Sequence, residues 1–173
     1  MPVYAERLRT GVLNPRPRPQ VVRRDGALAL VDGDSGPGQV AAVLATDLSI
    51  ELAREHGVGI VSVRRSGHYG AAGYYAIRAA EAGLVGMSMT NTEPLVIPYG
   101  GAGAALGTNP IAFAAPTPTG VFNLDMATSQ VAMNKVFNAR TEGRAIPEGW
   151  GVDERGEPTT DPNAAVFGVP LGE

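Results

Sequence analysis

Residues 58–89, VGIVSVRRSGHYGAAGYYAIRAAEAGLVGMSM, indicate the fold class of this chain. The two ends of the stretch, VGIVSV and LVGMSM, are short apolar runs typical of buried strands. Between them the pattern predicts a helix from about Ala71 to Ala82, which stops at Gly83 because glycine readily takes the left-handed conformation that ends helices. Strand, helix and strand in this order make up a unit from which α/β folds are built.

The sequence before this stretch continues the alternation of helices and strands. Residues 38–57 predict a helix that stops at Gly57, and residues 21–33 predict a hairpin that turns at Asp25-Gly26. Residues 2–11 read as the end of another helix. The apolar face of the helix at 38–57 is expected to carry Val40, Val43, Leu44, Leu48 and Leu52.

The sequence after this stretch adds two strands, NPIAFAAP and VFNLDMA, and a helix that ends at Gly143. From Ile146 onward it predicts loops. We therefore expect an α/β fold in which VGIVSV, LVGMSM, NPIAFAAP and VFNLDMA share one mixed β-sheet with helices packed against it.

Composition narrows the function classes. The chain has 173 residues, about one domain, and a net charge of −3, so no basic excess points to nucleic acid. No apolar run is long enough to predict a membrane span, and the first residues lack the apolar run of a signal peptide. The chain has no cysteine, which excludes disulfides and thiolate metal sites and fits a cytoplasmic protein.

His68 is the strongest candidate for acid–base chemistry. It lies in a glycine-rich turn just before the predicted helix, where the positive end of the helix dipole disfavours the imidazolium form. A neutral imidazole near pH 7 can accept a proton from a substrate hydroxyl. The alternative is that His68 only fills a polar turn. His56 is explained without chemistry, because a cation is stabilised at a helix C-terminus.

Three further segments carry candidate ligand residues. The loop PYGGAGAALGTNP lacks the third glycine of a dinucleotide fingerprint, since Leu106 stands there, but its glycines can bring the backbone close to a ligand. Thr128 or Ser129 is either the N-cap of the following helix or a ligand donor. Thr90-Asn91 ends a predicted strand, where sites on α/β folds tend to lie.

Five motifs together resemble the type 2 malate/L-lactate dehydrogenase family, which includes ureidoglycolate and sulfolactate dehydrogenases and reductases of cyclic imino acids. They are SGHYGAAGYYA, MTNTEP, YGGAGAALGTNPIAFAAPTP, DMATS and IPEGWGVDERGEPTTDP, and they extend over most of the chain. The resemblance implies an NAD(P)-dependent oxidoreductase with a fold of its own, distinct from the common doubly wound dinucleotide fold. Its substrate would be a small 2-hydroxy acid oxidised to a 2-oxo acid, or an imine equivalent being reduced, and the full-length protein would be a homodimer.

The resemblance also implies roles for particular residues. His68 would be the proton acceptor, and Tyr4 would border the substrate pocket. The cofactor, NAD or NADP, would be bound by Asn91, Thr92, Gly107, Thr108, Asn109, Asp125, Met126, Ala127 and Thr128. We expect His68, Asn91, Thr92, Asn109 and Asp125 to line one cleft, because ligand sites form where strand ends converge.

The chain also departs from the family, whose members are about twice as long. An upstream Ser-His-Gly stretch with its arginine and a downstream cofactor-binding lysine have no counterpart here. Residues 1–173 are therefore expected to be a partial domain truncated at both ends, with the cofactor-binding part at roughly 58–173, and at most weakly active alone. The alternative to a redox enzyme is a catalytically incomplete fragment, acting at most as a nucleotide-binding or non-enzymatic module.

Two other enzyme classes fit poorly. A Ser-His hydrolase would need a strained nucleophile turn, and no G-x-S-x-G motif accompanies Ser66 and His68. A metal enzyme would need more ligands, because the sequence contains only two histidines and no carboxylate cluster joins them.

Overall fold

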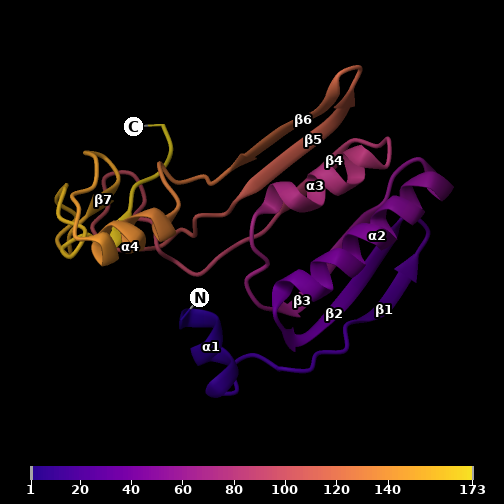
Figure 1. The fold of residues 1–173 in the computed structure, drawn as a ribbon, viewed down its shortest axis with the longest axis horizontal. Coiled ribbons are helices and arrows are strands. Elements are labelled where there is room, and N and C mark those ends of the chain that lie inside the picture. Colours follow the sequence, from indigo (N-terminus) through magenta and orange to yellow (C-terminus); the bar gives the residue numbers. More distant parts are fainter. Residues whose placement is uncertain (1, 173) are drawn as a thin grey trace. The chain divides into compact units, whose positions relative to one another are not determined.

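The computed structural model describes residues 2–172, and its backbone divides into two compact units. The first unit comprises Met1–Met87 and Phe113–Asn123, and the second comprises Ser88–Ala112 and Leu124–Glu173. In chain order the elements are α1 (Pro2–Arg9), β1 (Gln20–Asp25), β2 (Leu28–Gly36), α2 (Gly38–His56), β3 (Ile60–Ser66), α3 (Ala72–Glu81), β4 (Gly86–Met89), β5 (Ile111–Thr117), β6 (Gly120–Met126), α4 (Met133–Glu142), β7 (Gly151–Val152) and β8 (Phe167–Gly168) (Figure 1).

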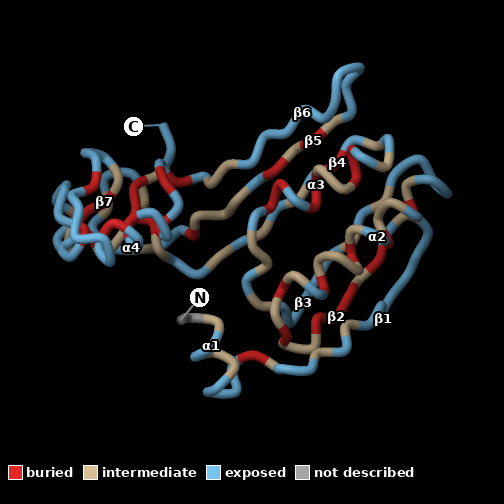
Figure 2. The backbone as a smooth tube through the Cα atoms, viewed as in Figure 1, coloured by how far each residue is buried: buried red, intermediate tan, exposed pale blue. Residues whose placement is uncertain are grey.

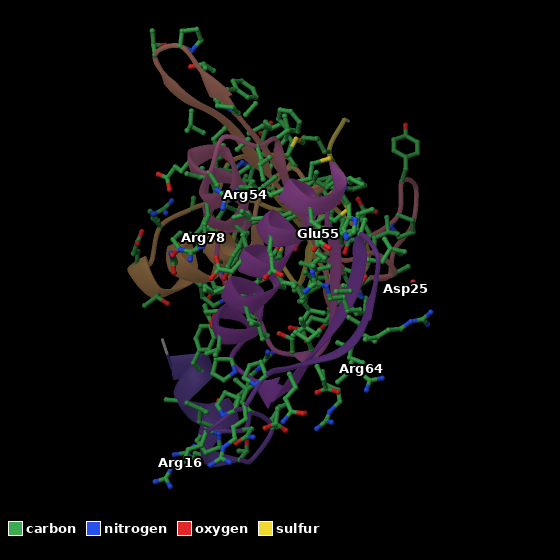
Figure 3. The ribbon with its side chains drawn as sticks, turned by 90° about the vertical axis from the view of Figure 1, so that its right-hand side faces the viewer. Arg16, Asp25, Arg54, Glu55, Arg64 and Arg78 are labelled. Atoms are coloured by element: carbon green, nitrogen blue, oxygen red, sulfur yellow. The ribbon has the colours of Figure 1, made fainter. Side chains whose placement is uncertain are left out.

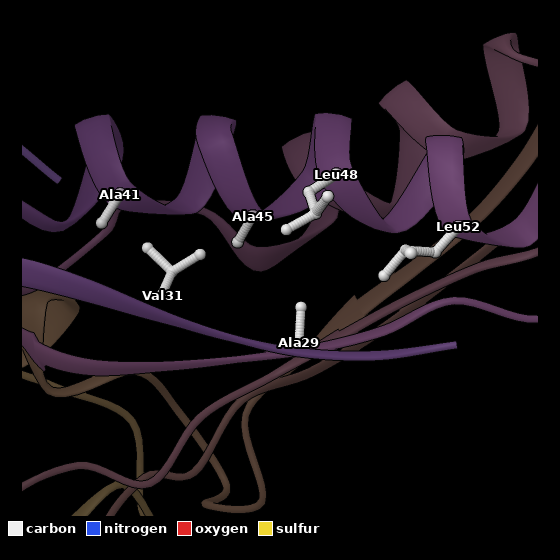
Figure 4. Close-up of a cluster of buried hydrophobic side chains, with 6 residues drawn as sticks. All are labelled: Ala29, Val31, Ala41, Ala45, Leu48 and Leu52. Carbon is white, nitrogen blue, oxygen red and sulfur yellow. The ribbon is translucent and has the colours of Figure 1, made fainter. Parts of the chain in front are cut away.

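In the first unit, a three-stranded sheet of order β1-β2-β3 packs one face against α2. Ala29 and Val31 on β2 meet four buried residues of the helix, Ala41, Ala45, Leu48 and Leu52 (Figure 4). Small alanines on both surfaces let the helix approach closely, and Leu52 and Val31 are fully buried. Truncating a buried leucine such as Leu52 to alanine typically costs about 2–5 kcal/mol, so this cluster is a main source of the unit's stability.

The helix at 38–57 is confirmed, but its buried face is only half right. Val40 is 49% exposed, and Ala41 and Ala45 are buried in its place. The sequence pattern favoured large aliphatic side chains throughout, whereas close packing on the sheet buries small alanines beside Leu48 and Leu52. Gly57 ends the helix as expected, with φ of 82° and its N–H bonded to the Ala53 carbonyl.

The predicted hairpin is formed by β1 and β2, which pair antiparallel. Asp25 pairs with Leu28, so the two-residue turn is Gly26-Ala27, one residue later than predicted. Gly26 has φ of 54°, in the left-handed region that favours glycine in tight hairpin turns.

The prediction of one shared sheet is wrong. β3, which contains most of VGIVSV, pairs parallel with β2, whereas β4, β5 and β6 form a separate three-stranded sheet in that order. The strand–helix–strand unit with parallel strands is therefore β2-α2-β3, one helix earlier than the sequence suggested. Apolar runs identify strands but do not say which neighbour a strand pairs with. The α/β class is confirmed, and the first sheet is mixed because β1-β2 is antiparallel.

The helix after His68 is confirmed to within a residue at each end. It is α3, and Gly83 follows it with φ of 83°. Arg78 on α3, which is labelled in Figure 3, binds Asp47 on α2 through two contacts of 2.7 and 3.0 Å. This pair joins the last turn of α3 to α2 at the surface.

In the second unit, α4 contributes Met133, Val136 and Ala139 to a cluster of buried residues that also contains Val131, Ile146 and Ala165. Figure 2 shows buried backbone along α4. The helix ends at Gly143, as predicted, but its N-cap is Ala132, without a side-chain hydrogen bond. Thr128 and Ser129 are therefore not its N-cap. The region after Ile146 is mostly loops, as expected, except for the two-residue strands β7 and β8. None of the helices described is long and apolar enough to cross a membrane.

Candidate active site

The loop that carries His68 connects β3 to α3 and is anchored to the start of α2. Gly38 donates its N–H to the His68 carbonyl at 3.1 Å, and Gly67 donates to the Gly36 carbonyl at 2.9 Å. A Cβ on Gly38 would lie 2.1 Å from the Gly67 oxygen, so only glycine permits this approach. The first residue of α2 therefore fixes the backbone of the histidine loop.

A charged network supports the strand ends beneath this loop. Asp32 is buried and accepts a hydrogen bond from Arg64 at 3.0 Å and one from the Asp34 N–H at 3.0 Å. The Asp34 N–H, and then the bond from Arg64, lower the pKa of Asp32 below its usual range despite the opposing effect of burial. Asp34, Ser35 and Arg65 have positive φ angles of 48–55°, which are costly for residues with side chains. Strain of this kind persists where surrounding contacts fix the turn.

The side chains of Tyr4, Gln39 and His68 meet in the first unit. The Tyr4 hydroxyl is hydrogen-bonded to Nδ1 of His68, and Gln39 Nε2 lies 3.3 Å from the Tyr4 oxygen. The Tyr4 and His68 rings lie edge to face, with centroids 5.8 Å apart. The Gly70 N–H also donates to Nδ1, at 3.3 Å. The imidazole is thus oriented by α1, by α2 and by its own loop.

His68 is an exposed residue, yet its environment favours the neutral imidazole. Partial desolvation of the ring, and secondly the positive charge of Arg7, lower the pKa of His68 from its ordinary value of 6.5. The direction agrees with the prediction, but the helix dipole is not among the causes. A pKa below 6.5 favours the neutral imidazole near pH 7.

The second unit gathers five of the predicted cofactor residues where β4 ends, β5 begins and β6 ends. Thr92 donates its N–H to Asn109 Oδ1 at 3.0 Å, and its hydroxyl accepts the Thr108 N–H at 2.9 Å. Thr128 donates its N–H and its hydroxyl to the Thr108 carbonyl at 2.8 and 3.2 Å. Thr108 therefore links the segments on either side of it.

Gly107 makes this cluster possible. A Cβ there would lie 2.4 Å from Asn109 Oδ1 and 2.5 Å from the Thr92 hydroxyl. Close packing within the cluster thus explains why position 107 is a glycine. Asn109 itself has φ of 34°, which asparagine tolerates better than most residues.

The remaining predicted cofactor residues flank this cluster. Asn91 is exposed just before Thr92, and Asp125 is exposed near the end of β6. Met126 and Ala127 are half-buried and lead into Thr128. Their role toward a cofactor stays a prediction.

The cleft expected to join His68 with Asn91, Thr92, Asn109 and Asp125 also stays a prediction. His68 belongs to the first unit, and the other four residues belong to the second.

Sequence reasoning missed three residues that contact or influence the histidine loop. Gln39 and Arg7 lie on helices whose sequences indicate only an apolar face or a helix end. Tyr75 was visible within the quoted motif GYYA, but nothing in the sequence shows that its hydroxyl bonds to the Tyr69 carbonyl. Long-range contacts of polar side chains carry no periodic signal.

Comparison with known proteins identifies the family. The model of the family described as Malate/L-lactate dehydrogenase matches residues 1–173. The chain belongs to this family, as its motifs suggested.

Individual relatives agree with this assignment. A malate dehydrogenase of Pyrococcus abyssi is 49% identical over 98% of this chain and 48% of its own length. A ureidoglycolate dehydrogenase (NAD(+)) of Escherichia coli is 43% identical over 93% of this chain and 46% of its own length. The crystal structure of delta1-piperideine-2-carboxylate reductase from Pseudomonas syringae superposes with a TM-score of 0.92 at 38% identity, covering 99% of this chain and 53% of that one. The chain thus spans about half the length of the relatives it matches.

Proposed function

We propose that this chain forms the proton-transfer site and part of the cofactor site of an NAD(P)-dependent oxidoreductase. The reaction is the interconversion of a small 2-hydroxy acid and its 2-oxo acid. One observation carries the proposal: in a chain of a dehydrogenase family, an exposed imidazole has a lowered pKa and is oriented by a tyrosine hydroxyl. The relatives named as malate and ureidoglycolate dehydrogenases support the class of substrate.

The proton chemistry assigns a role to each side chain of the first unit. Neutral His68 accepts the proton of the substrate hydroxyl, and it returns that proton to the carbonyl oxygen in the reverse direction. The Gly70 N–H donates to Nδ1, so Nδ1 carries the lone pair of the neutral ring. Tyr4 orients the ring from α1 and borders the substrate. Partial desolvation of the ring, and secondly the charge of Arg7, lower the pKa of His68 and so favour the neutral ring.

The cluster around Thr108 fits part of a nicotinamide nucleotide. Its hydroxyl, amide and backbone N–H groups bond one another, so they would hold these segments in place at the edge of the cofactor, and such neutral groups suit a nucleotide better than a metal ion. Among residues 2–172, no group of three or more histidine, cysteine or acidic side chains could hold a metal. When bound, the cofactor would supply or take up the hydride. Asn91, Thr92, Gly107, Thr108, Asn109 and residues 125–128 would hold it, and NAD and NADP are both candidates.

The oligomeric state and location belong to the same proposal. The resemblance implies a homodimer, and the absence of cysteine fits the cytoplasm. Light scattering of the purified 173-residue chain and of the full-length protein measures the oligomeric state.

The test uses two proteins: this chain alone, and a chimera in which it replaces the matching half of the Pyrococcus abyssi malate dehydrogenase. NADH or NADPH absorbance is followed with a panel of 2-oxo acids, and the reverse reaction with 2-hydroxy acids. We expect turnover by the chimera and little or none by the chain alone. A folded chimera that binds NADH but turns over no member of the panel would favour the non-enzymatic, nucleotide-binding alternative.

A further inference from the structure

Tyr75 connects the core of the first unit to the histidine loop. Its side chain is 5% exposed, and its ring stacks on that of Tyr69 with centroids 4.9 Å apart and planes 1° from parallel. Its hydroxyl donates a hydrogen bond to the backbone carbonyl of Tyr69. Burial raises the pKa of Tyr75 to about 12, so the hydroxyl keeps its proton and remains a donor.

The Tyr69 carbonyl and the Gly70 N–H belong to one planar peptide group. In a trans peptide these two groups point in opposite directions, so a bond that holds the carbonyl on one side also aims the N–H on the other. The Gly70 N–H is aimed at Nδ1 of His68, 3.3 Å away. Gly70 has φ of 89°, a conformation that lets the chain turn at this peptide.

The two groups that contact Nδ1 differ in what they can select. The Tyr4 hydroxyl can donate or accept, so it fits either tautomer of the neutral imidazole. A backbone N–H can only donate, so the Gly70 contact selects the tautomer with its lone pair on Nδ1 and its hydrogen on Nε2.

We propose that Tyr75 is a positioning residue that acts through the Tyr69–Gly70 peptide to determine which nitrogen of neutral His68 carries the lone pair and which carries the hydrogen. The catalytic meaning of this choice rests on the proposed function. The tautomer itself is a property of the folded chain and is measured without any turnover.

The experiment uses the 173-residue chain labelled with ¹⁵N-histidine, at a pH above the pKa of His68. The chain contains only two histidines, so His56 serves as an internal reference. Two-bond ¹H–¹⁵N correlations distinguish a protonated from an unprotonated ring nitrogen. In the wild type, we expect the Nδ1 of His68 at the shift of an unprotonated nitrogen and its Nε2 at that of a protonated one.

The variant Tyr75→Phe keeps the ring and its stacking but removes the donor. We expect the two nitrogen shifts of His68 to move toward each other as the other tautomer becomes populated, with His56 unchanged. Tyr4→Phe removes a hydroxyl that can either donate or accept, so this variant is expected to keep the wild-type tautomer. Tyr99→Phe is the matched control, because that tyrosine is 84% exposed.

Two outcomes overturn the proposal. One is a wild-type His68 with its hydrogen on Nδ1, a result that needs no variant and is unaffected by any folding defect. The other is a Tyr75→Phe protein with wild-type circular dichroism and unchanged His68 shifts, which would reduce Tyr75 to a packing residue. Neither result depends on turnover by the chimera, so the proposed function is judged separately.

Discussion

The two units of the chain build their candidate sites from different chemistry. In the first unit, the site is built on an ionisable imidazole, His68, which is hydrogen-bonded to Tyr4 and lies near the charge of Arg7. In the second, Thr92, Thr108 and Asn109 contribute hydroxyls and an amide that are neutral at every ordinary pH. The difference separates two tasks: exchanging a proton needs a tuned pKa, whereas holding a polar ligand needs fixed neutral donors and acceptors. Substitutions in the first unit should therefore change rate and pH dependence, and those in the second should change stability and binding.

Removing the imidazole should have the largest effect. In the chimera, His68→Ala is expected to lower kcat about 10²- to 10⁴-fold, the range typical of a lost general base. NADH affinity, measured by fluorescence titration, should stay within about twofold, because a base acts in the transition state and not in cofactor binding.

His56→Ala provides the matched control for this prediction. That histidine ends α2 and contacts only Glu55, at 3.5 Å, among the ion pairs described, so its loss should leave kcat unchanged. Near-normal turnover in His68→Ala would remove His68 from the mechanism.

The next largest effect is expected in the second unit, on stability. In Gly107→Ala, the new methyl group would meet Asn109 Oδ1 and the Thr92 hydroxyl at 2.4 and 2.5 Å. Overpacking of this kind costs roughly 1–3 kcal/mol, so the urea midpoint of the chain should fall.

Gly103→Ala is the matched control, since nothing lies within 4 Å of a Cβ at that position. Equal midpoints for the two variants would show that the cluster around Thr108 is loose. Its use as a preformed ligand site would then be untenable.

A second contrast, between local and long-range properties of the chain, explains which parts of the fold the sequence could predict. Helices and their ends were predictable because glycine in the left-handed region, as at Gly57, Gly83 and Gly143, is a local property of the chain. The pairing of β3 with β2 was not predictable, because it depends on residues that meet only after α2 has packed on the sheet. Local rules fix elements, and long-range contacts fix their neighbours.

The sites divide in the same way. His68 stood out because a histidine in a glycine-rich turn is unusual within a local window, and the motif then suggested its role. Gln39 and Tyr75 did not stand out, because their contribution is one hydrogen bond each to a partner fixed by the fold. The closeness of Thr92, Thr108 and Thr128 was implied only through resemblance, since 36 positions separate the first from the last.

Loss of the Tyr4 hydroxyl should have an intermediate effect on the first site. Tyr4→Phe removes one hydrogen bond to His68, worth about 1 kcal/mol, so kcat of the chimera should fall roughly fivefold. A fall as deep as that of His68→Ala would instead mean that the proton passes through the tyrosine. Tyr99→Phe should be neutral, and no change in Tyr4→Phe would exclude the hydroxyl from the reaction.

The smallest effect should come from Arg7, which acts on His68 only through its charge. The ring is desolvated and lies near this cation, and both effects place the pKa of His68 below 6.5. His68 accepts protons only when neutral, so kcat/KM falls as the pH drops through that pKa. Arg7→Met should raise the pKa part of the way toward 6.5 and move the acidic limb to higher pH, without changing the plateau. Added salt should shrink the difference between variant and wild type, because the charges are near solvent.

The lowered pKa of His68 should also affect the stability of the chain, which is measured without any turnover. The pKa of His68 is lower in the folded state, so the unfolded chain binds more protons in the window between the lowered pKa and 6.5. The free energy of unfolding therefore rises with pH through that window. Below the window, the cost of protonating His68 in the folded state is fully present. Arg7→Met narrows the window and should flatten the rise in urea titrations from acidic to neutral pH, whereas Arg9→Met, on the same helix, should leave it unchanged. A rise equal to that of the wild type in Arg7→Met would mean that desolvation alone sets the pKa of His68, and that α1 contributes Tyr4 to the site but no charge.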